Sequence, residues 1–265
     1  MDLTKFAEFI TALGSLNGYA STIAETKRAL EMRNAQVLTR GQNDAIIFAD
    51  AVKAIDAVHE LPLTVDTIIQ INKSFDGGGD EQPTMPGHLR NDVYNPELDS
   101  VSVIVNEVTQ EAYFAQGVIT REDIQTIIDE WQNSLKLGED AWRLFARLAK
   151  LQPFQDGNNR TALIAANLAF GAYSTDNYLL IPARTADRYR FTADLMDYYV
   201  ANNAEDAEVV FQRMLSWVDG NQLDSPSFSP SYTDRQFNAQ TTVYPTEQKP
   251  TSEAIADLFN QEQVD

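Results

Sequence analysis

The chain has 265 residues, 43% of them hydrophobic, which is enough to bury the core of one large domain or of one domain with appendages. It contains no cysteine, so disulfides and thiolate metal sites are excluded. The formal net charge of −19 argues against general binding to nucleic acid or to an anionic membrane, although one helix N-terminus can still hold an anion. No apolar stretch approaches the roughly 20 residues of a membrane helix. The N-terminus has no basic region followed by an apolar run, so we expect a soluble, cytoplasmic protein.

The first 80 residues predict four helices. Apolar residues recur at helical spacing from Phe6 to Leu13, and further helical stretches cover about 22–32 and 44–59. Pro62 ends the third stretch, and a fourth helix that begins near Val65 stops at the glycine run of residues 77–79. We therefore expect an N-terminal helical region at residues 1–60, followed by a core domain at residues 61–220.

The middle of the chain predicts a small β-hairpin. Residues 85–90 have the composition of a loop. Residues 101–105 begin by alternating apolar with polar side chains, as in a short strand, and Tyr113 and Phe114 are expected on a return strand.

Helices resume at about 122–135, 139–151, 185–202 and 206–218. Residues 162–170 are almost wholly apolar, which predicts a helix buried in the centre of the domain. From residue 221 prolines and polar residues dominate, which indicates a linker or disordered tail over 221–265, with a candidate amphipathic helix at 252–259. The expected fold class is all-α, mostly helical, with the small β-hairpin.

A loop between two predicted helices carries the residues with chemical potential, and it reads Leu-Gln-Pro-Phe-Gln-Asp-Gly-Asn-Asn-Arg-Thr-Ala over residues 151–162. Pro153 discourages continuation of the preceding helix, and Gly157 permits a positive φ angle and close approach of a ligand. Unpaired N–H groups at the start of the next helix, with its dipole behind them, favour a phosphate.

Three side chains of this loop fit the same ligand. Arg160 can bind phosphate oxygens in a bidentate manner, and Asn158 offers an amide donor. Asp156 offers a hard oxygen of the kind that holds Mg²⁺ together with substrate phosphates. The four residues 156–159 alone are more simply explained as an ordinary turn with a helix cap.

The whole string resembles the signature of the Fic family, His-Pro-Phe-x-Asp/Glu-Gly-Asn-x-Arg. The resemblance extends to residues 86–90, which are similar to the segment before the family's flap, and to the predicted hairpin, which fits the flap itself. It implies a Fic/Fido fold and an enzyme that transfers AMP from ATP to a hydroxyl side chain of a target protein. It also implies Mg²⁺ at Asp156, a backbone anion hole at residues 157–160 that includes Asn159, and Arg160 as a catalytic residue on the nucleotide phosphates. Phe154 would anchor the loop.

Gln152 departs from the signature, because the family's histidine, the general base, belongs at this position. A glutamine amide cannot take up a proton near neutral pH, so we expect ATP binding to be retained and transfer to be much reduced. His59 and His88 are the two histidines of the chain, and only His88, in the approach to the hairpin, is a candidate substitute. The glutamine is compatible with a natural variant and with an engineered knockout.

Two further departures concern the phosphate site. Leu163 stands where longer versions of the signature carry a second arginine. Asn159 stands where glycine or lysine is usual, and the lysine form resembles Doc, the kinase branch of the family. Gly157 favours AMP transfer, since Doc-like loops usually carry alanine there.

Residues 21–26 partly resemble the inhibitory helix of many family members, Ser/Thr-x-x-x-Glu-Gly/Asn. Glu25 would then be inhibitory by pairing with Arg160 and competing with phosphate. The alternative is that Glu25 lies on a solvated helix face, and Glu31 is a weaker candidate for the same role.

Three other function classes remain open. The chain could be a non-catalytic nucleotide-binding pseudoenzyme or interaction module, a Doc-like protein kinase, or, least favoured, a purely structural helical protein. The partners expected under the leading hypothesis are ATP, Mg²⁺ and a target protein with a Ser, Thr or Tyr hydroxyl. A homo-oligomer is compatible with the sequence, and neither nucleic acid nor membrane is expected as a partner.

Overall fold

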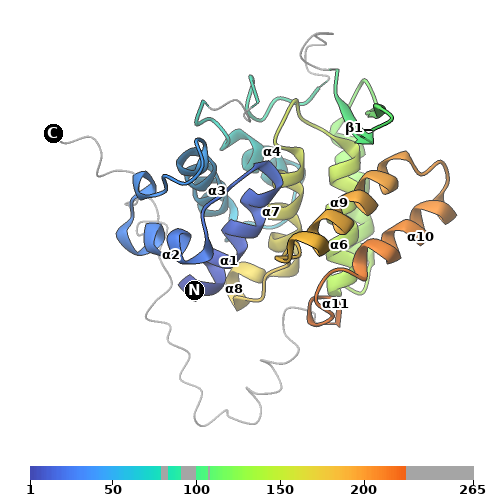
Figure 1. Cartoon of the computed structure of the whole chain (residues 1–265). Helices are drawn as coiled ribbons and strands as arrows, with labels where there is room; N and C mark the ends of the chain where they lie inside the picture. The colour runs from blue at the N-terminus through green and yellow to red at the C-terminus, as the bar shows by residue number, and fades with distance from the viewer. Residues whose placement is uncertain (79–82, 91–99, 107, 225–265) are drawn as a thin grey trace.

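A computed structural model describes residues 1–78, 83–90, 100–106 and 108–224. These residues form a predominantly helical fold with one two-stranded sheet (Figure 1). Within the described ranges no helix combines the length and apolar character required to span a bilayer.

The four helices predicted in the first 80 residues are confirmed. They are α1 (Leu3–Gly14), α2 (Ile23–Met32), α3 (Asp44–Val58) and α4 (Val65–Lys73), with short 3₁₀ turns at Ser15–Asn17 and Ala35–Val37. Three of the helices start at a side chain that accepts backbone N–H groups: Asp2 for α1, Thr22 for α2 and Thr64 for α4. Such caps satisfy donors that have no partner inside the helix.

Helix α7 (Asn158–Phe170) lies in the centre of the molecule (Figure 1). It packs against α6 (Gly138–Leu151) on one side and against α1, α3 and α4 on the others. Nearly all of its residues are buried, as the apolar sequence of residues 162–170 predicts. The helix also starts four residues earlier than this apolar stretch, so the signature residues Asn158 and Arg160 belong to its first turn and are themselves buried.

The predicted hairpin is confirmed as β1 (Ser102–Asn106) and β2 (Glu111–Phe114). The strands are antiparallel, with Val103 opposite Tyr113 and a register irregularity between Ile104 and Asn106. Strand β1 also contacts helix α9 (Thr185–Val200), which fixes the hairpin over one end of the helical body (Figure 1).

The remaining helices are α5 (Arg121–Asn133), α8 (Ala172–Thr175), α10 (Ala204–Leu215) and α11 (Asn221–Asp224). The sequence did not predict α8 and α11, because four residues are too few to show a helical period. Helix α11 occupies the start of the predicted tail and packs on α6, and Gln222 Oε1 accepts the N–H of Leu180 at 2.9 Å. The rest of the tail, including the amphipathic helix predicted at 252–259, lies outside the described residues.

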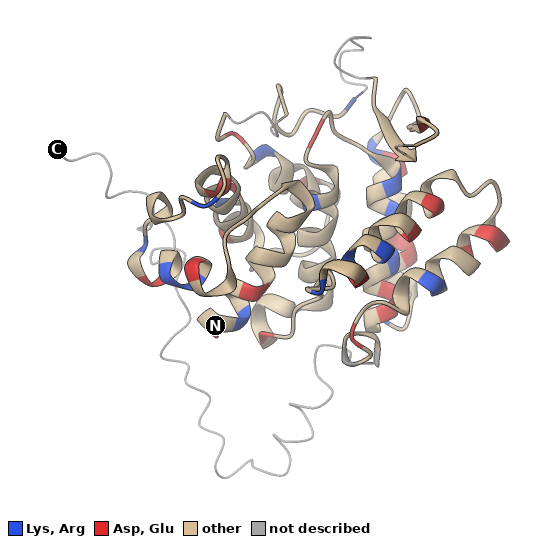
Figure 2. Ribbon diagram, viewed as in Figure 1, with Lys and Arg blue, Asp and Glu red and all other residues tan. Residues whose placement is uncertain are grey.

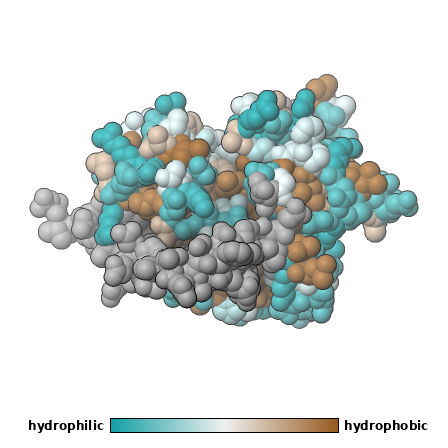
Figure 3. Space-filling model, turned by 90° about the horizontal axis from the view of Figure 1, so that it is seen from below, coloured by the Kyte–Doolittle hydropathy of each residue, from teal (hydrophilic) through white to brown (hydrophobic). Residues whose placement is uncertain are grey.

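Charged residues concentrate on the outer helices, whereas the ribbon around α7 carries few of them (Figure 2). The face seen in Figure 3 is mainly hydrophilic and is interrupted by separate hydrophobic patches. The buried hydrophobic residues of the described ranges form one core cluster, which includes most of α7.

Asn167 is a polar residue inside this core, and we predict that Asn167→Ala lowers the free energy of unfolding by about 2–4 kcal/mol. Its Nδ2 donates to the carbonyl groups of Leu163 and Leu179, at 2.9 and 3.2 Å, and its Oδ1 accepts the N–H of Leu179 at 2.8 Å. Urea unfolding measures the change, with Asn133→Ala as the control, because Asn133 makes one exposed bond to Asp129. Equal losses in the two variants would contradict the prediction.

Candidate active site

The loop between α6 and α7 has two residues in the left-handed region. Gln152, the C-cap residue that follows α6, has φ 50°, and Gly157, the N-cap residue of α7, has φ 74°. A Cβ atom on Gly157 would also lie 2.7 Å from Cδ2 of Phe75. Glycine therefore suits residue 157 both in its backbone and in the space available. The positive φ is the one that the sequence predicts, while the close neighbour is the ring of Phe75.

The start of α7 has no side-chain cap. The side chain of Asn158, the first helical residue, turns back into the loop, where its Oδ1 accepts the N–H of Phe154 at 2.9 Å and its Nδ2 donates to Phe154 O and Gln152 Oε1, both at 2.9 Å. The sequence predicts Asn158 as a donor to a ligand, but in the structure this amide closes the loop. The backbone N–H groups of the first turn are the donors that remain available for an anion.

A polar cavity of about 220 Å³ adjoins this turn. It is lined by the loop and α7 from below, by the hairpin, and by the end of the 3₁₀ turn after α1; the lining residues are Leu16, Asn17, Val101, Ser102, Val103, Gln152, Gln155, Asp156, Gly157, Asn158 and Asn159. The structure thus brings together five of the six predicted site residues of the loop. It also places the predicted hairpin over them.

Arg160 is the exception. Its side chain is 1% exposed and does not line the 220 Å³ cavity. The guanidinium carbon lies 4.5 Å from the centroid of the Phe75 ring, beneath the loop. The guanidinium group of Arg160 is therefore buried beneath the first turn of α7 and does not contact the cavity.

Gln152 lines the cavity and is 5% exposed. Its Nε2 donates to the carbonyl of Ala149 at 2.7 Å, and its Oε1 accepts from Asn158 Nδ2 at 2.9 Å. Both ends of the amide are therefore engaged inside the protein.

Asn72 of α4 is fully buried and holds the loop from behind. Its Nδ2 donates to Asp156 O at 2.9 Å and to Thr161 Oγ1 at 3.3 Å, and its Oδ1 accepts the N–H of Gly87 at 2.9 Å. The sequence analysis missed this residue. The available signal is an asparagine four residues after Ile68, on the buried face of an amphipathic helix.

Arg90 holds the other end of the loop. It is 0% exposed, its Nε donates to Gln152 O at 2.6 Å, and its backbone N–H donates to Pro153 O at 3.2 Å. Leu89 and Phe154 form an isolated antiparallel bridge beside it. Residues 86–90 therefore brace the loop, which gives a physical role to the segment whose sequence resembles the family.

Two tyrosines connect the hairpin with α9 and with the helix start. Tyr199 donates its hydroxyl to Asn159 Oδ1 at 2.8 Å, and burial raises the pKa of Tyr199, so it remains a neutral donor. Tyr113 of β2 donates to Lys150 O at 3.0 Å, and its ring centroid lies 5.4 Å from that of Tyr199.

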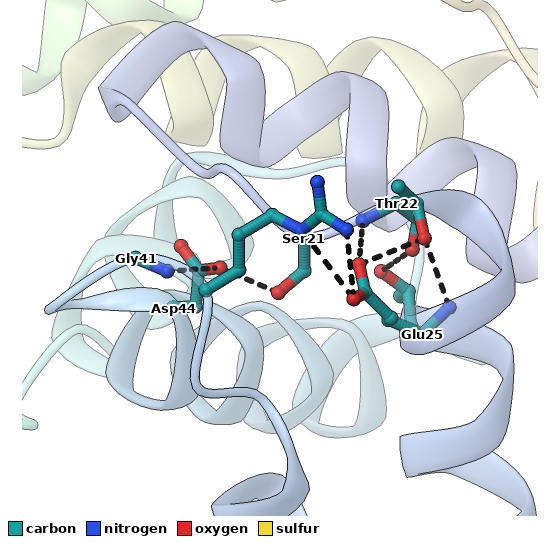
Figure 4. A network of polar contacts seen from close by, with 7 residues as sticks. Ser21, Thr22, Glu25, Gly41 and Asp44 are labelled. Carbon is teal, nitrogen blue, oxygen red and sulfur yellow. Dashed lines mark hydrogen bonds and ion pairs between the residues drawn. The ribbon is translucent and has the colours of Figure 1, made fainter.

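The structure does not bring Glu25 to Arg160, and the exposed position of Glu25 fits the alternative interpretation, a solvated helix face. Glu25 accepts from the backbone N–H and hydroxyl of Thr22 in a capping box, and it forms an exposed ion pair with Arg40 at 3.1 Å (Figure 4). These bonds, with Thr22 contributing most, lower the pKa of Glu25. The same network continues through Ser21 and Asp44, so this segment anchors α2 to α3 (Figure 4).

The sequence analysis also made predictions for Leu163 and for the two histidines. Leu163 is fully buried, as predicted for an apolar residue that faces the core. His59 lies at the end of α3, with Nδ1 3.0 Å from Asp56 O, and neither His59 nor His88 lines the cavity.

Asp156 fits a magnesium ion only in combination with a nucleotide. Within the described residues no group of three or more acidic or histidine side chains gathers to hold a metal. Asp156 lines the cavity, and Mg²⁺ is commonly held by one or two carboxylates together with substrate phosphates. The described residues therefore suit a magnesium ion that is held jointly by Asp156 and a nucleotide. They do not form a site in which protein side chains alone surround the ion.

A larger cavity of about 690 Å³ lies between α1, α2, residues 180–188 and residues 217–222, with a mainly apolar lining. None of the predicted site residues lines it. Its size therefore does not make it the site of the loop chemistry.

Residues 62–170 match the family model described as Fic/DOC family. A crystal structure of a Fic domain containing signaling protein from Bacteroides thetaiotaomicron is similar, with a TM-score of 0.53, 19% identity, and coverage of 82% of this chain and 80% of that chain. The comparison with curated proteins finds no match. The match over residues 62–170 supports membership of the Fic/DOC family, and the structural similarity shows that the chain has the fold of that Fic domain protein.

We predict that Asn72→Ala lowers the free energy of unfolding by about 2–4 kcal/mol and exposes the loop to proteolysis, because two partly buried backbone groups lose their partner. Asn72→Asp should also be destabilising, since a carboxylate cannot donate to Asp156 O. Limited proteolysis and urea unfolding test both variants. A stable Asn72→Ala protein with a protected loop would contradict the role assigned to Asn72.

Proposed function

We propose that the chain is a protein adenylyltransferase that moves AMP from ATP to a Ser, Thr or Tyr hydroxyl of a target protein, with transfer impaired by Gln152. One observation carries the proposal: an uncapped helix start, backed by a buried arginine, opens into a polar cavity beneath the hairpin. Such a place favours phosphate groups.

The reaction requires that the target's hydroxyl oxygen form a bond to the α-phosphorus, that the bond to the bridging oxygen break, and that pyrophosphate leave. Backbone N–H groups of residues 158–160 would hold the phosphates, and Arg160 would add positive charge from behind. Asp156 would hold Mg²⁺, which offsets charge on the phosphates when bound. The edge of β1, with Ser102 and Val103 at the cavity, would receive the target segment.

The hydroxyl proton must go to a base, and the structure supplies none at the expected place. Gln152 is a neutral amide whose oxygen and nitrogen are already hydrogen-bonded. Positioning and phosphate stabilisation remain, while general-base assistance, worth roughly 10²–10⁴ in rate, is absent.

The same observation supports the second candidate, a nucleotide-binding module without transfer activity. Both ends of the Gln152 amide are hydrogen-bonded within the loop, which is what we expect of a loop that binds a nucleotide and has no catalytic base. A Doc-like kinase is less well supported, because an alanine at residue 157 would collide with Phe75 in this packing.

We predict that Gln152→His raises AMP transfer by about 10²–10⁴-fold, measured as labelling of the protein itself or of lysate proteins with α-labelled ATP. Histidine is among the residues that tolerate the positive φ of residue 152, so the loop should keep its shape. Asp156→Ala in the Gln152→His background is the matched control, and it should remove the gain.

Three outcomes separate the candidates. ATP binding without labelling in Gln152→His would favour the binding module. Labelling from γ-labelled ATP in place of α-labelled ATP would show a kinase. Absence of ATP–Mg²⁺ binding in both proteins would contradict the proposed function.

A further inference from the structure

Asp50 of α3 is a buried carboxyl group that the proposed chemistry does not use. It is 3% exposed, and its Oδ2 has no hydrogen-bond partner. A Cβ atom on Gly77 would lie 3.1 Å from Asp50 Oδ1, so this carboxyl borders the turn that follows α4. A buried carboxylate with an unsatisfied oxygen is costly, and its retention calls for an explanation.

Arg160 borders the same turn from the side of α7. Its guanidinium stacks on the ring of Phe75, two residues before Gly77, and is as deeply buried as Asp50. Helices α3 and α7 pack directly against each other. Asp50 and Arg160, which can carry opposite charges, therefore lie in one buried region beneath the loop. Charges in such a region interact more strongly than they do in water.

We propose that Asp50 is the internal counter-charge of Arg160 and competes with nucleotide phosphates for its positive potential. The inference rests on the proposed function, since it concerns the regulation of that same site. It also assigns to Asp50 the competing role that the sequence suggested for Glu25, which instead pairs with Arg40.

The other charges that act on Asp50 among the described residues are Lys53 on its own helix and Asp76 in the turn. These two form an ion pair at 2.6 Å, and each side chain is about half exposed. They largely offset each other, which leaves Arg160 as the main buried charge acting on Asp50.

Burial raises the pKa of Asp50 to about 7, and the nearby Arg160 limits the rise. Below that pH the group is a neutral acid and leaves the field of Arg160 intact. Above it, the carboxylate cancels part of that field. Nucleotide binding adds negative charge, which raises the pKa further, so binding takes up a proton and tightens as the pH falls.

The test is calorimetric titration of ATP–Mg²⁺ into the full chain and into Asp50→Asn, at about pH 6 and pH 8. We expect Asp50→Asn to bind up to about tenfold more tightly than the unaltered chain at pH 8, and both proteins to bind within about twofold at pH 6. ATP's own titration affects both proteins equally and cancels in the comparison.

Asp56→Asn is the matched control. Asp56 lies on the same helix, has a buried oxygen without a partner, and has a pKa raised by burial, but His59 and Glu60 act on it in place of Arg160. It should behave as the unaltered chain at both pH values. If Asp50→Asn and the unaltered chain bind ATP–Mg²⁺ with the same affinity at pH 6 and again at pH 8, the inference is wrong while the proposed function stands.

A second measurement does not depend on nucleotide binding. The Asp50 carboxyl can be titrated by carbon-13 NMR in the unaltered chain and in Arg160→Gln. We expect its pKa to be higher in Arg160→Gln, because a stabilising positive charge is lost. An unchanged pKa would overturn the pairing even if ATP binds. Failure of all proteins to bind ATP, with the NMR shift present, would contradict the proposed function and the competition with phosphates, and would leave only the charge pairing of Asp50 with Arg160.

Discussion

Helix α7 begins inside the protein without a side-chain cap, and its first turn opens into a polar cavity. Unpaired N–H groups at a helix start are costly when buried unless something satisfies them. Here the N-cap residue is Gly157, which has no side chain, and the amide of Asn158 is turned back into the loop. The fold therefore keeps a set of donors available at one place, and the rest of the site is arranged around that place.

Keeping the helix start open requires support from several elements. Asn72 ties the loop to α4 and to Gly87, while Arg90 binds carbonyl groups at the other end. Gly157 is the residue whose missing side chain lets the turn lie against Phe75. The hairpin is fastened separately, through Tyr113 and the end of α6. Fixed polar groups of this kind can stabilise charge without reorganising during a reaction.

Most of the helices could be predicted from the sequence, because their apolar residues recur every three to four positions over nine or more residues. The hairpin and the loop could be predicted as well, through strand alternation and the signature around Gly157. The contacts of Asn72 with Asp156 and Thr161 could not, because they join α4 to residues more than 80 positions away. Helix α11 was missed for a different reason, since its four residues lie in a segment whose composition is that of a tail.

The charge of Arg160 shows where a signature and a structure differ. The motif predicts direct contact with phosphates, whereas in the structure the side chain is buried against the Phe75 ring. The central claim, that the start of α7 holds a nucleotide's phosphates, is tested most directly by amide NMR during titration with ATP–Mg²⁺. The account predicts that the amide signals of residues 157–160 shift most and become protected from hydrogen exchange. Unchanged signals at these residues, with shifts confined to another surface, would contradict it.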